Sequence, residues 1–369
     1  MLLVAAGGGG DAITASALAP TLQLDTAPPV LTYSWDRLLV DPLPGPRSYA
    51  DFDGLSQLAP NIFEILPTTV ARPPAGSTLP RLAGDLPSRI LLLDPTEGAI
   101  GMAEQVKSAA AHFGAPRLGV VDVGGDIIAQ GDEPNLRSPL ADMLALAACT
   151  LAELPCQLIV LGPGIDGELD ETMVRERLAD LDAHPIGSLD ADTFADVLGV
   201  FAWHPSEASG LLAAAANGAR GCVETRDGGH RVYLTDDTTE AYSVDAHKAA
   251  APSPAALLRS STSLAEAADI VTRATGVDEI KYETDKAVRL RSRSARQASH
   301  DDLATVDGYA AEAAARGADY VTVRRLAELI GLTTSEGLSS FQALLADQRP
   351  SSYEPPLYRT WASHLRSKI

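Results

Sequence analysis

Short apolar runs recur along this chain, and each is followed by Gly, Pro or Asp and then by a longer, Ala-rich amphipathic segment. Such an alternation is typical of strands that are buried on both faces of a sheet and are connected by helices. It predicts an α/β protein with a Rossmann-like open, mostly parallel sheet flanked by helices. The expected strands are residues 1–6, 30–35, 89–94, 117–123, 157–162 and 197–203, and the expected helices are 11–23, 98–113, 139–152, 170–181 and 206–217.

Two helix ends can be read from single residues. Ser138 stands directly before Pro139, so we expect it to be the N-cap of the helix that begins there. Asn217 and Gly218 close another helical segment and predict a left-handed C-cap.

The alternation of apolar runs and Ala-rich segments stops after residue 235. The remainder holds an amphipathic segment at 263–275, a strand-like segment at 278–283 and helical patterns at 302–315, 322–330 and 336–346. We therefore expect a Rossmann-like domain over residues 1–235 and a smaller, mainly helical cap or subdomain over residues 236–369.

Acidic residues outnumber basic ones, with 49 Asp and Glu against 29 Lys and Arg and a net charge of -20. A surface of this charge repels phosphates and anionic lipids, so neither nucleic acid nor membrane is an expected partner. Cys149, Cys156 and Cys222 lack metal-ligand spacing and lie in apolar stretches, which favours a reducing cytoplasm. The expected partner is a small-molecule ligand, and a homo-oligomer stays open.

In open α/β sheets, ligands bind beyond the carboxyl ends of the strands, so the residues that follow each apolar run are the first candidates for a site. Glycines at such positions let backbone amides approach an anion closely. The candidates for this role are Gly7, Gly8, Gly9, Gly10, Gly124 and Gly125. The alternative for the first four is a tight strand-to-helix turn that allows close helix packing.

Acidic residues follow both glycine stretches, and carboxylates can transfer protons or hold a divalent cation. We take Asp11 and Asp126 as catalytic candidates. Asp126, Asp132 and Glu133, together with Asp122, are close enough in sequence to converge on one metal ion, for which Mg²⁺ or Mn²⁺ would be suitable. The alternatives are an ordinary N-cap for Asp11 and a surface hairpin or solvated acidic loop for residues 122–133.

A second pair for proton transfer is His204 with Glu207, at the start of an expected helix that Ser206 can cap. Capping alone is the alternative explanation for this pair. Arg47 and Arg137 are the candidate cations for an anionic substrate, with Ser138 beside the latter. Either arginine could instead form a surface ion pair.

Several familiar signatures are absent from the sequence: a Gly-x-Ser-x-Gly elbow, a Cys-x-x-Cys pair and a His-Glu-x-x-His helix. The first glycine loop lacks the spaced Gly-x-Gly-x-x-Gly pattern, so a standard NAD site is weakly supported. The stretches "AAGGGGD", "DPLPGPR", "DVGGDIIAQGDEPNLRSPLAD" and "PSEASGLLAAAANGARGCVE" resemble the family labelled domain of unknown function 1152, found in archaea and bacteria. The resemblance implies an α/β fold and no particular activity.

Gly, Asp, Glu, His and Arg thus concentrate at the expected strand ends. This concentration predicts a cytoplasmic enzyme that acts on a small polar, anionic or phosphorylated metabolite by group transfer, hydrolysis or lyase chemistry. The alternative from another class is a non-catalytic sensor or scaffold that binds a nucleotide or sugar phosphate. A purely structural role for the glycines in an oligomeric partner protein is the third possibility.

Overall fold

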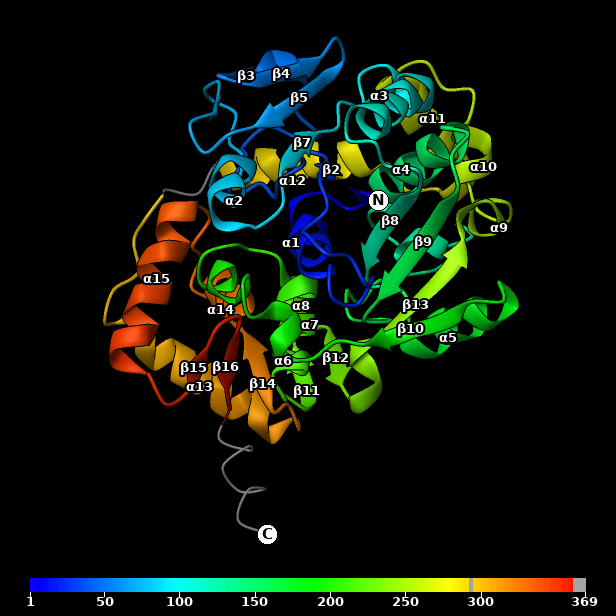
Figure 1. Cartoon of the computed structure of the whole chain (residues 1–369). Coiled ribbons are helices and arrows are strands. Elements are labelled where there is room, and N and C mark those ends of the chain that lie inside the picture. Colours follow the sequence, from blue (N-terminus) through cyan, green and yellow to red (C-terminus); the bar gives the residue numbers. More distant parts are fainter. Residues whose placement is uncertain (292–294, 361–369) are drawn as a thin grey trace.

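The computed structural model describes residues 1–291 and 295–360, and its main element is a nine-stranded sheet (Figure 1). The five central strands are parallel, and the strands at both edges run antiparallel to their neighbours. In spatial order the strands are β10 (His184–Ser188), β13 (Glu240–Asp245), β9 (Cys156–Leu161), β8 (Leu118–Val123), β1 (Leu2–Ala5), β2 (Val30–Thr32), β7 (Ile90–Leu92), β5 (Ile62–Ile65) and β4 (Ser56–Ala59). The predicted α/β class and mostly parallel sheet are confirmed.

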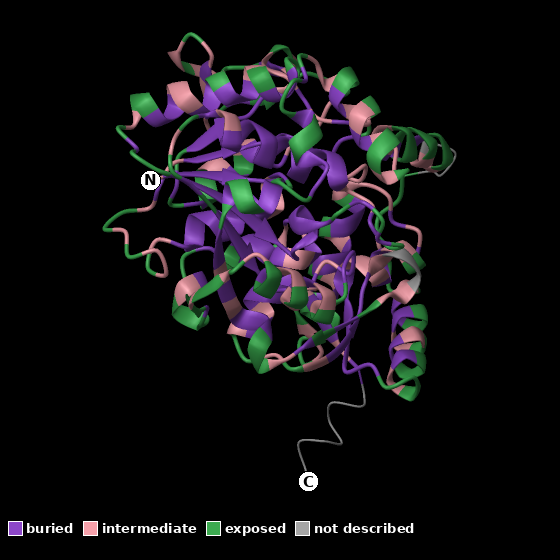
Figure 2. Cartoon of the chain, turned by 90° about the vertical axis from the view of Figure 1, so that its right-hand side faces the viewer, coloured by how far each residue is buried: buried purple, intermediate pink, exposed green. Residues whose placement is uncertain are grey.

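The central strands are buried on both faces because their apolar side chains alternate between two cores (Figure 2). Leu2 and Val4 point into one core, while Leu3 and Ala5 point into the other. The helices of the first core are α3 (Gly98–His112), α4 (Pro139–Leu151), α9 (Ala246–Ala250), α10 (Ala255–Leu258) and α11 (Leu264–Thr275). Those of the second core are α1 (Gly9–Ala17), α2 (Leu79–Asp85), α6 (Ala191–Phe194) and α7 (Glu207–Ala216), and α5 (Glu171–Asp180) packs with Val174 and Leu178 on the first.

A second sheet of five strands lies below the first in Figure 1. Its spatial order is β12 (Arg231–Leu234), β11 (Gly221–Glu224), β14 (Tyr320–Thr322), β16 (Leu357–Arg359) and β15 (Tyr353–Glu354). A third core joins it to α13 (Asp302–Ala315), α14 (Val323–Leu329) and α15 (Ser335–Gln348). The remaining elements are α8 (Arg226–Gly229), α12 (Glu279–Arg291) and a small ribbon of β3 (Phe52–Asp53) and β6 (Val70–Ala71).

The two sheets do not divide the chain at residue 235. β11 and β12 precede that point and belong to the second sheet, whereas β13 follows it and belongs to the first. The C-terminal part is rich in helices as expected, but its described residues also supply four strands, β13 in the first sheet and β14, β15 and β16 in the second. The chain therefore passes from the first sheet to the second, back again, and once more to the second.

Two expected strands are wrong. Residues 197–203 contain a 3-10 helix, Leu198–Ala202, because the buried side chains Phe194, Val197, Val200 and Phe201 follow a helical spacing. Residues 278–283 form the start of α12, where the buried Glu279 and Glu283 lie one turn apart on the same face.

The helix ends agree with the sequence in position. Pro139 is the first residue of α4, although the Ser138 side chain does not cap it. Asn217 ends α7, and Gly218 follows in the left-handed region with φ of 93°. Cys149, Cys156 and Cys222 are all buried and free. Within the described residues, no helix has the length and apolar character needed to cross a membrane.

Candidate functional site

The candidate site lies where the strand order reverses. The chain leaves β1 toward β2 and β7 on one side and occupies β8 and β9 on the other, so β1 and β8 are adjacent strands with divergent connections. The loops that follow such a pair of strands leave a crevice between them. Here the crevice is a cavity of about 110 Å³, which we call the inner chamber; it is lined by Gly7, Asp11, Asp122, Asp126, Asp142 and His204, among others.

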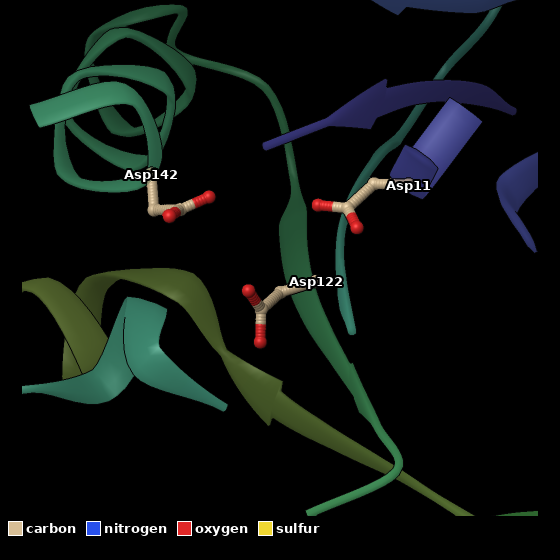
Figure 3. A group of neighbouring side chains, drawn as sticks. All are labelled: Asp11, Asp122 and Asp142. Carbon is tan, nitrogen blue, oxygen red and sulfur yellow. The ribbon is translucent and has the colours of Figure 1, made fainter. Parts of the chain in front are cut away.

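Three carboxylates converge in the inner chamber from three separate elements (Figure 3). Asp11 stands in the first turn of α1, Asp122 in β8 and Asp142 in the first turn of α4. One oxygen of each lies within 4.8 Å of the others, and all three residues are at most 8% exposed. Figure 3 shows the three carboxylates facing one another.

Asp142 is the most unusual member of this group. Its Oδ1 atom is buried and accepts no hydrogen bond from any residue that the structure describes. Burying a carboxylate oxygen without a partner is costly, so such atoms in folded proteins usually face a ligand, an ion or water. Asp11, by contrast, accepts a hydrogen bond of 2.8 Å from the Gly7 amide.

The surroundings disfavour ionisation of these carboxyl groups. Burial raises the pKa of Asp11 to about 7. Burial followed by the neighbouring carboxylates raises the pKa of Asp122 and Asp142 well above the ordinary range. Acids this close repel one another when charged, and a bound divalent cation would remove that repulsion.

Asp126 and Asp166 extend the carboxylate group at the ends of β8 and β9. Burial, then nearby acids, raises the pKa of Asp126, and burial raises that of Asp166 to about 7. The Oδ2 atom of Asp166 is also buried without a hydrogen-bond partner among the described residues. The inner chamber therefore holds Asp142 and Asp166 in addition to Asp11, Asp122 and Asp126, which were candidates from the sequence.

At several of the candidate glycines, neighbouring side chains approach the backbone so closely that a Cβ atom would not fit. A Cβ atom at Gly7 would lie 2.9 Å from Asp11 Oδ2, and one at Gly10 would lie 2.5 Å from Ser206 Oγ on the first turn of α7. Gly124 and Gly125 have φ of 134° and 97°, which disfavours other residues, and a Cβ at Gly124 would overlap the Asp166 carboxylate. Both readings of the glycine stretch, close packing and the lining of a ligand cavity, thus apply together.

His204 belongs to a chain of hydrogen bonds at the edge of the inner chamber. The Ser206 amide donates to His204 Nδ1 at 3.2 Å, so the ring proton lies on Nε2, which is 3.3 Å from Thr78 Oγ1. Thr78 Oγ1 donates in turn to Asp36 Oδ1 at 2.7 Å. Burial lowers the pKa of His204 to about 3 and raises that of Asp36 to about 6, so the imidazole is neutral near pH 7.

A larger cavity of about 440 Å³, the outer chamber, adjoins the inner one. Arg37, Arg137, Arg226 and Glu279 line both, together with Ser138 and Glu168. Arg324, Leu332 and Leu338 line only the outer chamber. The two chambers therefore form one continuous space that is acidic at its inner end and contains arginines toward its outer end.

Ser138 and Arg137 line both chambers, but part of their bonding capacity is used within the chain. The amides of Arg137 and Ser138 donate to Glu168 Oε2 at 2.6 and 3.0 Å, and the Ser138 hydroxyl donates to Glu168 Oε1 at 2.6 Å. Glu279 accepts a further bond from the Leu140 amide. Two glutamates thus satisfy the start of α4, which explains why Ser138 does not cap it.

Glu207 lines the inner chamber, but its main contacts lead away from it. It forms an ion pair of 3.4 Å with Arg226 and accepts a hydrogen bond from Thr322 Oγ1 at the end of β14. Its position in the first turn of α7 is the one expected. The structure thus gives Glu207 contacts that join the two sheets, and it does not pair the residue with His204.

Three charged sequence candidates line neither chamber, and the same is true of the glycine candidates Gly8, Gly124 and Gly125. Arg47 is buried, forms an ion pair of 2.9 Å with Asp41 and donates to three carbonyls of its own loop, so it cannot also clamp a ligand in this arrangement. Asp132 is exposed. Glu133 forms an ion pair with Arg177 and accepts from the amides of Gln130 and Gly131, which uses both of its oxygens.

The structure adds site residues that the sequence reasoning did not select. The most informative is Asp142, the one charged residue in the otherwise apolar helix "PLADMLALAACTL", a pattern that indicates a buried carboxylate. Arg37 directly follows Asp36 in the loop after β2, and unlike Arg47, which lies in the same loop, it lines both chambers. The others are Asp166, Glu168, Arg226, Glu279 and Arg324, whereas Asp122 was already a metal candidate from the sequence.

The comparison with known families agrees with this architecture. Residues 2–287 match the family described as "Protein of unknown function (DUF1152)", and the chain belongs to that family. The matched span includes every residue of the inner chamber named above. No curated protein and no solved structure matches the chain.

Proposed function

We propose that this member of the DUF1152 family is a metal-dependent enzyme that acts on a small anionic metabolite in the inner chamber. The observation that carries the proposal is the convergence of Asp11, Asp122 and Asp142, with a buried Asp142 oxygen that has no partner among the described residues. A set of three carboxylates with no sulfur or nitrogen ligand suits a hard divalent cation such as Mg²⁺ or Mn²⁺.

The division of roles follows from position. Asp11, Asp122 and Asp142 hold the cation, which when bound polarises a substrate oxygen or activates water. Because Gly7, Gly9 and Gly10 have no side chains, they leave room for the substrate to approach the carboxylates closely. His204 is neutral, and its Nε2–H orients Thr78 toward Asp36, whose carboxyl group, with a pKa raised to about 6, is the group that accepts or passes a proton at the chamber edge.

This assignment supports group transfer, hydrolysis or lyase chemistry, since each uses a cation beside a proton-transfer group. A nucleotide or sugar-phosphate sensor would bind its ligand in the same space, and only product formation separates the two. We expect a thermal-shift screen of phosphorylated metabolites with Mg²⁺ to give hits. Assays of product formation on those hits then decide between enzyme and sensor.

Metal binding is the first test. Titration calorimetry with Mn²⁺ on the full chain should show saturable binding that Asp142→Asn weakens by a factor of about 100 or more, because the variant removes one charged ligand. Asp132→Asn is the matched control, since it removes an exposed carboxylate outside both chambers. Absence of Mn²⁺ and Mg²⁺ binding by the wild-type protein, or equal binding by Asp142→Asn, would contradict the proposal.

A further inference from the structure

Three arginines face the outer chamber from three distant parts of the chain. Arg37 lies in the loop after β2, Arg226 begins α8 after β11, and Arg324 lies in the first turn of α14 after β14. The second sheet is what brings the last two together, because β11 pairs directly with β14. Arg37 and Arg226 also line the inner chamber, so the arginines stand at the junction of the two spaces.

The three guanidinium groups are close enough to repel one another. Burial, followed by the charges of Arg226 and Arg37, lowers the pKa of Arg324 to about 10. Among the described residues, the Arg324 side chain donates one hydrogen bond, to the Pro205 carbonyl at 3.1 Å, and a neutral carbonyl does not balance its charge. A cluster of like charges that is partly buried requires a compensating anion.

Acidic side chains of the chain itself compensate this cluster only in part. Arg226 pairs with Glu207, whereas the Arg37 side chain forms no hydrogen bond or ion pair with the residues that the structure describes, and only the Arg37 carbonyl accepts bonds, from the amides of Val40 and Asp41. Glu168 and Glu279, which also line the outer chamber, accept bonds from the start of α4. Burial raises the pKa of Glu279 to about 8, which leaves it largely uncharged near pH 7.

We infer that Arg37, Arg226 and Arg324 bind a phosphate group of the substrate, and that the substrate is an organic phosphate. This inference rests on the proposed function, because it names the substrate class of the same site. A guanidinium presents several donors in a planar fork that matches phosphate oxygens, and three of them around one space suit a dianion better than a single carboxylate.

The apolar lining of the outer chamber suggests where the organic part of such a substrate would bind. Apolar side chains from the loop after β2, from α12, from the segment between α14 and α15 and from α15 line the outer chamber: Leu38, Leu39, Tyr282, Leu290, Leu332 and Leu338. Its volume of about 440 Å³ lies in the range of small-molecule sites. The phosphate would then lie between an apolar group in the outer chamber and the carboxylates of the inner one.

The test uses inorganic phosphate as the probe, titrated into the full chain by calorimetry with and without Mg²⁺. We expect saturable binding in the wild-type protein and a loss of about tenfold or more in affinity for Arg37→Gln and for Arg324→Gln, as expected for removal of one charge-assisted contact. Arg72→Gln, which removes an exposed arginine paired with Asp53, is the control and should bind like wild type. Circular dichroism verifies that Arg324→Gln folds, and Arg37→Gln carries the test if it does not.

The outcomes separate this inference from the proposed function. Absence of phosphate binding by the wild-type protein in both conditions, unchanged affinity in Arg37→Gln, or acetate binding as tight as phosphate would each overturn the inference. Mn²⁺ affinity is measured on the same samples and should change by less than about twofold in Arg37→Gln, since the carboxylates are intact. Failure of Mn²⁺ to bind the wild-type protein would count against the metal site while the phosphate result still decides the arginine site.

Discussion

The inner and outer chambers are parts of one space, yet they are built in opposite ways. The inner chamber is formed by loops that directly follow adjacent parallel strands, β1 and β8, and by the start of α4. The outer chamber depends on β11 and β14, which are almost a hundred residues apart in sequence, and on α12. Under the proposed function, the parallel sheet supplies the metal ligands, whereas the second sheet supplies two of the three arginines that would bind the substrate.

The largest expected effect separates the two chambers by their kinetics. Asp11→Asn should lower kcat by a factor on the order of 1,000, because it removes a cation ligand from the reacting centre. Arg37→Gln should act mainly on KM, by about tenfold, because it removes a binding contact. Steady-state assays of both variants on a hit from the substrate screen test this division.

The stability of Asp11→Asn provides the internal control for that experiment. Burial disfavours the charged form of Asp11, so its neutral replacement should not lower the thermal midpoint of the metal-free protein. Retained turnover in Asp11→Asn, or a kcat effect of Arg37→Gln as large as that of Asp11→Asn, would break the comparison.

The next effect compares a glycine packed against Asp166 of the inner chamber with a glycine beside Leu332 of the outer chamber. Gly124→Ala should destabilise the fold by roughly 3 kcal/mol, because φ is 134° and the added methyl group would overlap Asp166. Gly331→Ala, next to Leu332 of the outer chamber, adds a Cβ with nothing within 4 Å and should cost about 1 kcal/mol from its φ of 76° alone. Chemical denaturation measures both, and equal losses would mean that the inner wall is not tightly packed.

The last effect is a pH dependence of the inner chamber. Asp11 and Asp166 have pKa values of about 7 when folded, against 3.8 ordinarily, so their stabilising contribution is complete below 3.8 and is lost as pH rises through 7. Each contributes a slope of up to about 1.4 kcal/mol per pH unit in that window. Because Mn²⁺ binds the deprotonated carboxylates, it should offset this loss.

The measurement is the thermal midpoint with and without saturating Mn²⁺ at about pH 5.5 and about pH 8, with the gain larger at the higher pH. The thermal midpoint of Asp142→Asn should not rise when Mn²⁺ is added. A gain that is equal at both pH values would show that the carboxylates do not titrate as a cation site.

The same contrast explains what could be predicted from the sequence. The α/β class, five of the six expected strands and the loops of the inner chamber follow from local patterns, because a parallel sheet places consecutive strand ends at one edge. Gly7, Asp11 and Asp126 accordingly line one cavity, the inner chamber. The metal candidates Asp132 and Glu133 do not, because proximity in sequence does not fix the direction of a loop that leaves the chamber after Ile128.

The arginines of the outer chamber had no such local signal. Arg47 and Arg37 lie in the same loop, and only the fold shows that one is buried against Asp41 while the other faces the cavity. Glu279 was read as part of a strand because alternating apolar residues in a short segment do not distinguish a strand from a helix. Arg226 and Arg324 become neighbours only through the pairing of β11 with β14.

The interleaved path of the chain also constrains how the protein can be cut. The family match ends at residue 287, so a fragment with that boundary would retain β11 and β12 but lack β14, β15 and β16. One side of β11 would then present unpaired amides and carbonyls to solvent, which is a template for association with other strands. Self-association of such a fragment would therefore be a consequence of removing β14 from the second sheet. Protein for studies of this family is best prepared as the whole chain.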